Sequence, residues 1–258
     1  MPMPEILYST DPRETIIYVR DLVKRFGRFV ANDHLSFDVY KGEIFGFLGA
    51  NGAGKTTAIR ILCGLSTPTS GQINVAGYDA YLETEKIKKN IGYMSQKFSL
   101  YEDLSLEENF TFYGGVYGLS GKQIKEKTNL LLTRLDLLDE KKTVLKALPL
   151  GWKQKLAFCV AIMHDPKIVF LDEPTGGVDP ITRRQFWDLI YEASHNGITV
   201  FVTTHYMDEA EYCERVTIMV DGRIDALDTP ANLKSRYQAD TMNEVFLRLA
   251  RNAKSNGV

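Results

Sequence analysis

Apolar and polar residues follow one another along this chain in short runs that predict strands of two kinds. The stretch 35–39 alternates strictly, so we expect a half-exposed antiparallel strand there. Other runs are apolar almost throughout, which is typical of strands buried in a parallel sheet: 44–48, 168–171 and 198–203. The chain is therefore expected to be an α/β protein. Shorter strands are expected at 16–19, 72–75, 91–94, 216–220 and 223–226.

Between two of these strands, the segment 98–165 has the pattern of an insertion of helices. The residues 105–108 and 120–123 both fit capping boxes, which mark helix starts. A third helix is expected to begin near Leu150 and to end before 165–166, since proline disfavours helix at the preceding residue. Further helices are expected at 58–62, 182–193 and 206–213.

Two other regions are marked by turn-forming residues. Residues 1–14 are rich in proline and polar side chains, so a flexible N-terminal arm is expected. Asp221-Gly222 lies between two apolar runs and predicts a hairpin turn.

A glycine-rich segment follows the apolar run 44–48 and precedes an expected helix. It matches G-x-x-x-x-G-K-[ST], the pattern of a phosphate-binding loop. Its glycines allow positive φ and close approach to a ligand, and the helix N-terminus then faces an anion. Lys55 can reach terminal phosphates, and the Thr56 hydroxyl can ligate Mg²⁺. The alternative is a tight turn without a ligand. The expected nucleotide-binding residues are Gly49, Ala50, Asn51, Gly52, Ala53, Gly54, Lys55, Thr56 and Thr57.

Composition narrows the remaining possibilities. The chain has 258 residues, 44% of them hydrophobic, and a formal net charge of −2, so a general nucleic-acid footprint is not indicated. Three scattered cysteines indicate core thiols in a reducing compartment: Cys63, Cys159 and Cys213. No run approaches the ~20 apolar residues of a membrane span, and no secretory signal is recognised. We therefore expect a cytoplasmic protein whose membrane role, if any, needs a separate partner chain.

Acidic residues and a histidine follow two more of the expected strands. In parallel α/β sheets, ligands bind at these strand ends. Asp172 directly follows the run 168–171, and a carboxylate there needs a cation or hydrogen-bond donors. Glu173 can orient or deprotonate an attacking water; the alternative is a pair of helix-capping carboxylates. His205 follows the run 198–203 and can sense a γ-phosphate. Taken alone, it would be a solvated loop histidine, the interpretation given to His34, His164 and His195.

With these motifs in this order, residues 15–235 resemble the ATP-binding subunit of an ABC transporter. The resemblance implies a P-loop NTPase fold: a RecA-like core with an antiparallel β subdomain, and an inserted α-helical subdomain at about 98–165. It implies ATP and Mg²⁺, with Asp172, Thr56 and Gln96 at the metal and Glu173, His205 and Gln96 in catalysis. It places Asp179 in the D-loop 176–179, and Phe26 against adenine. A core position is the alternative for Phe26.

One motif departs from the family pattern. The signature Leu-Ser-Gly-Gly-Gln, which contacts the ATP of the opposite subunit, corresponds here to Leu148-Pro149-Leu150-Gly151-Trp152. Pro149 lacks the hydroxyl and one N–H, and Leu150 adds bulk. Since proline suits the first turn of a helix, the helix and its dipole should survive. We expect the γ-phosphate contact to rely on Gly151, with reduced transition-state stabilisation. The alternative is that the family tolerates this variant at full activity.

The resemblance further implies that two such subunits close head to tail over two ATPs and drive a membrane permease, as a homodimer or a heterodimer. The protein would then be peripheral on the inner face of the cell membrane. Aromatic residues between 98 and 117 form either a groove for the permease or ordinary core. The segment 236–258 is expected as a helical tail and resembles that of ABC-2 type exporters. The main alternative is a soluble ABC ATPase, such as an iron–sulfur cluster assembly subunit. The cargo is not encoded in these motifs.

Overall fold

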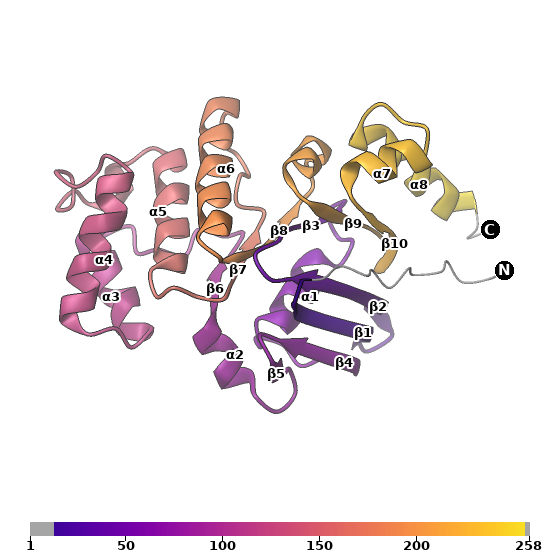
Figure 1. The fold of residues 1–258 in the computed structure, drawn as a ribbon, viewed down its shortest axis with the longest axis horizontal. Coiled ribbons are helices and arrows are strands. Elements are labelled where there is room, and N and C mark those ends of the chain that lie inside the picture. Colours follow the sequence, from indigo (N-terminus) through magenta and orange to yellow (C-terminus); the bar gives the residue numbers. More distant parts are fainter. Residues whose placement is uncertain (1–12, 256–258) are drawn as a thin grey trace.

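The computed structural model describes residues 13–255, with side chains up to Arg251, so the arm expected at 1–14 lies almost entirely outside it. A six-stranded sheet runs through the molecule in the order β10-β9-β3-β8-β7-β6 (Figure 1). Its strands are β3 (Ile44–Gly49), β6 (Ile91–Met94), β7 (Ile168–Asp172), β8 (Thr199–Thr204), β9 (Arg215–Val220) and β10 (Arg223–Asp228).

The strands of this sheet pair in parallel, except that β10 pairs with β9 in the antiparallel direction. Every residue of β3, β7 and β8 is buried, which confirms the three apolar runs as buried strands. The antiparallel pair β9–β10 turns at Asp221-Gly222, where the hairpin was predicted. Because the parallel strands end at one edge of the sheet, their C-terminal residues converge there.

A second, four-stranded antiparallel sheet has the order β2-β1-β4-β5. The strand predicted at 35–39 is present but belongs to the longer β2. Aromatic rings join this sheet to the first, because Phe37 of β2 lies 5.8 Å from Phe45 and 5.5 Å from Phe47 of β3. The strands of the second sheet are β1 (Thr15–Phe26), β2 (Phe29–Tyr40), β4 (Ser70–Val75) and β5 (Tyr78–Asp79).

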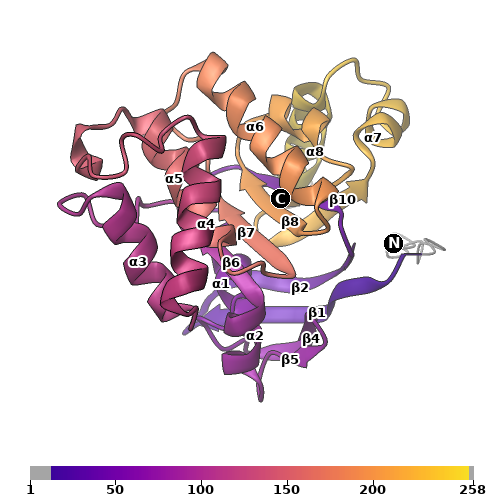
Figure 2. The same ribbon diagram turned by 60° about the vertical axis from the view of Figure 1, so that its left-hand side comes forward.

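Between β6 and β7 the chain forms the helices expected at 98–165, which lie together on one side of the molecule (Figures 1 and 2). Ser105 and Ser120 both make the predicted capping boxes. The third helix begins at Leu150, directly after Pro149, and ends at Ile162, as expected. These elements are α3 (Leu106–Val116), α4 (Gly121–Arg134), the 3₁₀ helix η1 (Leu145–Ala147) and α5 (Leu150–Ile162).

The six-stranded sheet separates two hydrophobic cores. One lies towards the antiparallel sheet and includes the apolar face of α1 (Lys55–Leu62). The other includes residues of α5, of α6 (Pro180–His195) and of the C-terminal helices α7 (Pro230–Arg236) and α8 (Met242–Ser255). Val245 and Leu249 of α8 are buried there, so the tail expected at 236–258 is anchored to the main body.

One local expectation needs correction, and one helix was missed. The helix expected at 206–213 is a 3₁₀ helix, η2 (Met207–Tyr212), because it is a single short segment between two strands. The helix α2 (Thr84–Asn90) was not predicted, since it has seven residues of which only Ile87 is buried and shows no apolar face.

Cys63, Cys159 and Cys213 are free and buried, as expected, and burial raises the pKa of each thiol. Within residues 13–255, no helix combines the length and apolar character that crossing a membrane requires.

Candidate functional site

The glycine-rich segment forms the turn between β3 and α1, and each glycine is required for its own reason. Gly52 and Gly54 have φ of 84° and 100°, in the left-handed region. At Gly54 an added Cβ would also lie 2.3 Å from the carbonyl oxygen of Ala31. Gly49 differs from the expectation of positive φ: it ends β3, and a Cβ there would lie 2.7 Å from the carbonyl oxygen of Met219. Glycine is therefore required at position 49 because the Met219 backbone lies close to it, and not because of a positive φ.

Lys55 opens α1 and is 4% exposed. Its Nζ donates to the carbonyl oxygens of Gly49 at 2.8 Å and Ala50 at 3.2 Å, and it forms an ion pair with Glu173 Oε1 at 3.2 Å. The ammonium is thus held inside the loop, and within the described residues its ion-pair partner is the Glu173 carboxylate. A phosphate oxygen placed in the loop would be a competing partner for this ammonium.

Asp172 ends β7 and is 1% exposed. Its Oδ1 accepts hydrogen bonds from Thr203 Oγ1 at 2.7 Å and Thr56 Oγ1 at 3.3 Å. Burial raises the pKa of this carboxyl, and the two hydroxyls partly offset that effect. The sequence argument that a carboxylate here needs donors is confirmed, and Thr203 is a donor that the sequence argument did not name.

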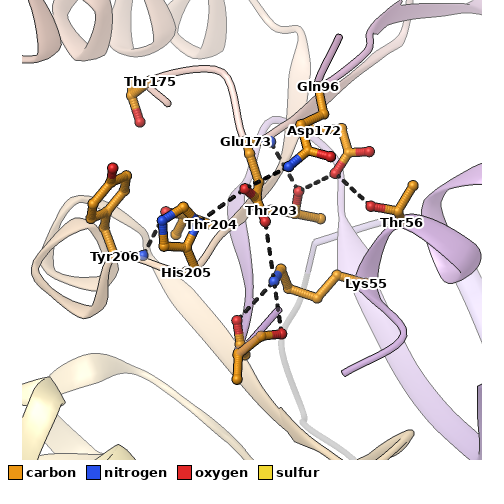
Figure 3. A network of polar contacts seen from close by, with 12 residues as sticks. Lys55, Thr56, Gln96, Asp172, Glu173, Thr175, Thr203, Thr204, His205 and Tyr206 are labelled. Carbon is orange, nitrogen blue, oxygen red and sulfur yellow. Dashed lines mark hydrogen bonds and ion pairs between the residues drawn. The ribbon is translucent and has the colours of Figure 1, made fainter. Parts of the chain in front are cut away.

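Glu173 joins the residues that the sequence placed at separate strand ends (Figure 3). Its Oε2 lies 3.0 Å from Gln96 Nε2 and 2.9 Å from His205 Nδ1, while Oε1 pairs with Lys55. The backbone of Glu173 has φ of 52°, which is rare for a residue with a side chain. Its N–H is fixed by the carbonyl oxygen and the hydroxyl of Thr203, both at 3.1 Å.

The helix-capping alternative for Asp172 and Glu173 is wrong, because the next helix, α6, is capped by Asp179 through the N–H groups of Ile181 and Thr182. The pair instead stands at the end of a buried strand, followed by a turn.

The four histidines have different surroundings. His205 is half-buried and paired with Glu173, unlike a solvated loop histidine. His34 and His195 are solvated, as expected, but they lie in β2 and at the end of α6, so the expectation that they lie in loops is wrong. That interpretation is wrong for His164, which stacks on Tyr117 with ring centroids 3.7 Å apart. Burial lowers the pKa of His164.

Three expected nucleotide contacts lie outside the Glu173 network. The Phe26 ring is 55% exposed beside Lys24 Nζ, so the core alternative for Phe26 is wrong. Gly151 and Asp179 line a separate cavity of about 570 Å³ between the start of α5 and the start of α6. A Cβ on Gly151 would lie 2.3 Å from Thr182 Cγ2, so these two helix starts are in close contact.

Sequence reasoning missed Asn32, a fully buried residue of β2. Its Nδ2 donates to the carbonyl oxygen of Gly54 at 3.1 Å, across 22 residues of sequence. Its Oδ1 has no hydrogen-bond partner within the described residues. The alternation at 35–39 could not have indicated it, because that pattern places position 32 on the outward face, and a register shift between Leu35 and Asn32 turns Asn32 inward.

The oxygen atoms around Asp172 are ligands that suit a hard cation. Mg²⁺ takes oxygen ligands and often only one or two carboxylates, and substrate phosphates complete its shell. Asp172 and the Thr56 hydroxyl supply two such oxygens 3.3 Å apart. Within residues 13–255, no group of three or more His, Cys, Asp or Glu side chains could hold a metal on its own.

A parallel sheet with a glycine loop between β3 and α1, and with a buried aspartate at the end of β7, one strand beyond the neighbour of β3, defines the P-loop nucleoside triphosphatase fold. The family model described as "ABC transporter" matches residues 32–176. The chain belongs to the ABC transporter family, a family of ATP-hydrolysing cassettes, and the resemblance stated from the motifs is confirmed.

Among the relatives, the probable multidrug ABC transporter ATP-binding protein YbhF of Escherichia coli is 46% identical over 255 residues, covering 96% of this chain. This chain spans only 44% of YbhF, less than half its length. The linearmycin resistance ATP-binding protein LnrL of Bacillus subtilis is 35% identical, over 90% of this chain and 78% of LnrL. A solved ATP-binding subunit of an ABC transporter matches with a TM-score of 0.82 and 28% identity, covering 91% of this chain and 99% of that one.

Proposed function

We propose that this chain binds and hydrolyses ATP as a subunit of an ABC exporter of the ABC-2 type. The observation that carries the proposal is the convergence of Lys55, Gln96 and His205 on one carboxylate, Glu173, beside the phosphate-binding loop. These residues come from α1 and from the ends of β6, β7 and β8, and few arrangements other than a nucleotide site would bring them together.

In the proposed reaction, the loop 49–57 holds the phosphates through its N–H groups, and Lys55 exchanges its ion pair with Glu173 for a phosphate oxygen. Release from Lys55 frees Glu173 to orient or deprotonate the attacking water. His205 and Gln96 hold the other carboxylate oxygen of Glu173 in place. Asp172, Thr56 and Gln96 would hold Mg²⁺, which neutralises developing charge on the phosphates.

The remaining expected site residues would contact the adenine or the ATP of a second subunit. Phe26 presents an exposed ring on which adenine can stack. Gly151 at the start of α5 and Asp179 at the start of α6 would face the ATP of a second subunit, which closes head to tail. The relatives named for multidrug transport and linearmycin resistance support an exporter over an iron–sulfur cluster assembly subunit.

The permease would dock on an aromatic patch at the start of the helical segment, which we define as Tyr101, Phe112 and Tyr113. Tyr101 and Phe112 are 48% and 45% exposed, and their rings meet edge to face at 4.9 Å. Phe110, by contrast, is fully buried. The aromatic residues between 98 and 117 therefore include both core and exposed members, and only the exposed patch supports a docking surface.

Glu173→Gln is the test of this function. It keeps the shape of the side chain but removes the base, so ATP should still bind while hydrolysis falls by roughly a hundredfold or more. Purification from detergent-solubilised membranes should then recover a membrane protein together with ATP trapped in a closed dimer. Hydrolysis at the wild-type rate would contradict the assigned role of Glu173, and recovery from the soluble fraction alone would refute the transporter proposal.

A further inference from the structure

A second polar cluster lies next to the Glu173 network and is not explained by it. Glu209, in η2, is fully buried. Its Oε1 accepts a hydrogen bond from Thr175 Oγ1 at 2.5 Å and lies 3.6 Å from Arg183 Nε. Within the described residues, Glu209 Oε2 and Arg183 Nε have no hydrogen-bond partner. Burying a carboxylate with an oxygen that lacks a hydrogen bond costs folding free energy. A well-packed apolar residue at this position would make the fold more stable.

The members of this cluster stand at fixed distances from the expected catalytic residues along the chain. Thr175 follows Glu173 by two residues, and Glu209 follows His205 by four. Arg183 lies in the first turn of α6, and its N–H donates to the carbonyl oxygen of Asp179 at 2.9 Å. The Glu209 carboxylate therefore contacts Thr175, in the segment after Glu173, and Arg183, in the helix that Asp179 caps. Glu209 itself belongs to the segment after His205.

The cluster also reaches the His205 ring through Tyr206. The Arg183 guanidinium lies 4.2 Å from the centre of the Tyr206 ring, and that ring lies 4.2 Å from the His205 ring. Figure 3 shows Tyr206 beside His205, with His205 bonded to Glu173. A continuous series of contacts thus runs from Glu209 through Arg183 and Tyr206 to His205.

We propose that Glu209 is a positioning residue for ATP hydrolysis, and that it acts through Arg183 and Thr175. Its charge holds Arg183 against Tyr206, and its bond to Thr175 fixes the turn after Glu173, so that His205 stays within hydrogen-bond distance of Glu173. The inference rests on the proposed ATPase function, and it concerns the rate of the chemical step, not the binding of nucleotide.

Glu209→Gln in the full chain tests it, because the amide oxygen can still accept from Thr175 while the buried charge beside Arg183 is lost. Arg183 then keeps the exposed Asp208, whose Oδ2 lies 3.5 Å from Arg183 Nη1, as an acidic partner. We expect kcat to fall by roughly ten- to a hundredfold, since misplacement of a catalytic group by about 1 Å has such effects. The Kd for a fluorescent ATP analogue should stay within about twofold, and the NMR signal of the His205 ring should shift. Glu211→Gln is the matched control, since Glu211 lies in the same 3₁₀ helix but pairs with Lys234 at a more exposed position; its kcat should match the wild type.

A kcat within about twofold of the wild type in folded Glu209→Gln would overturn the inference. If that variant does not fold, Thr175→Val decides the matter, because it removes only the hydroxyl and should also lower kcat without changing the Kd. A wild-type protein that neither binds nor hydrolyses ATP would overturn the proposed function, and the positioning role with it. Normal hydrolysis by the wild type and equally by Thr175→Val would overturn the positioning role alone.

Discussion

Asp172 and Glu173 are adjacent in sequence, but they differ in what surrounds them. Asp172 is held by two hydroxyls in a buried position, whereas Glu173 is held by an ammonium, an amide and an imidazole. Since burial raises the pKa of Asp172, ionisation of this carboxyl costs folding free energy at neutral pH. Such a cost is typical of functional positions, where activity and stability conflict.

We predict that Asp172→Asn raises the Tm at pH 7 by about 2–4 °C, the change that about 1 kcal/mol produces in a chain of this size. The folded pKa of Asp172 lies above its unfolded value of 3.8. As pH falls through the folded pKa, the wild-type carboxyl becomes protonated and its penalty disappears, so the advantage of Asn should shrink towards pH 4. Thermal unfolding of both proteins from pH 4 to pH 8 measures this.

Asp179→Asn is the control for that experiment. Hydrogen bonds from Thr182 lower the pKa of the exposed Asp179 carboxyl, so its ionised form is favoured in the folded state and its replacement should bring no gain in Tm at pH 7. An equal gain in both variants, or a gain for Asp172→Asn that is constant with pH, would contradict the explanation by burial.

At the scale of the element, α5 keeps a regular start in spite of its unusual sequence. The carbonyl oxygen of Pro149 accepts from the N–H groups of Trp152 at 3.0 Å and Lys153 at 3.1 Å, so the first turn is intact. Leu150 is 43% exposed at the mouth of the cavity that Gly151 and Asp179 also line. The helix dipole is therefore available at this site, but a hydroxyl and one N–H are not.

We predict that Pro149→Ser combined with Leu150→Gly raises the ATPase activity of the assembled transporter. One restored donor to transition-state charge is worth on the order of 3 kcal/mol elsewhere, which corresponds to a hundredfold or more in kcat. Steady-state hydrolysis by the complex in detergent is the measurement, with Leu148→Ile as a substitution in the same segment that adds no donor. Equal rates for variant and wild type would favour the alternative that this signature supports full activity.

Features whose cause is local in sequence were predictable at this scale. The capping boxes at Ser105 and Ser120, the start of α5 after Pro149 and the turn at Asp221-Gly222 depend on a few neighbouring residues, and each was predicted correctly. The buried strands were predictable for the same reason. The helix α2 was missed because it is too short to show periodicity.

The contacts that assemble the site could not be predicted, because they join distant parts of the chain. Asn32 reaches Gly54, Gln96 reaches Glu173 across 77 residues, and Glu209 reaches Thr175 across 34. A motif indicates which residue types serve a reaction, but only the fold determines which hydroxyl or amide holds each of them. Thr203, which contacts both Asp172 and Glu173, is the clearest example.

At the scale of the whole molecule, the site and the aromatic patch belong to different parts of the chain. The site stands where the parallel strands end, and the aromatic patch stands on the helical segment that follows β6. Gln96 is the site residue nearest in sequence to that segment, since it lies between β6 and α3. If a permease docks at the patch as proposed, the short stretch of chain that contains Gln96 would connect it to the site.

We predict that Tyr101→Ala with Phe112→Ala reduces recovery of the chain with membranes by about tenfold, because two exposed rings supply most of the apolar area of the patch. ATP binding by the isolated chain should be unchanged. Co-purification with detergent-solubilised membranes is the measurement, and Leu130→Ala, at a 63% exposed position of α4, is the control. Unchanged recovery would show that the permease docks elsewhere.

The hydrogen bond between Gln96 and Glu173 has a thermodynamic consequence. If docking at the aromatic patch favours one position of the helical segment, the same position determines whether Gln96 bonds to Glu173, and the two events share one coupling free energy. Such a coupling is reciprocal. Any change in ATP affinity that the permease causes must be matched by an equal change in permease affinity caused by ATP, so titrating either ligand in the presence of the other measures the same quantity.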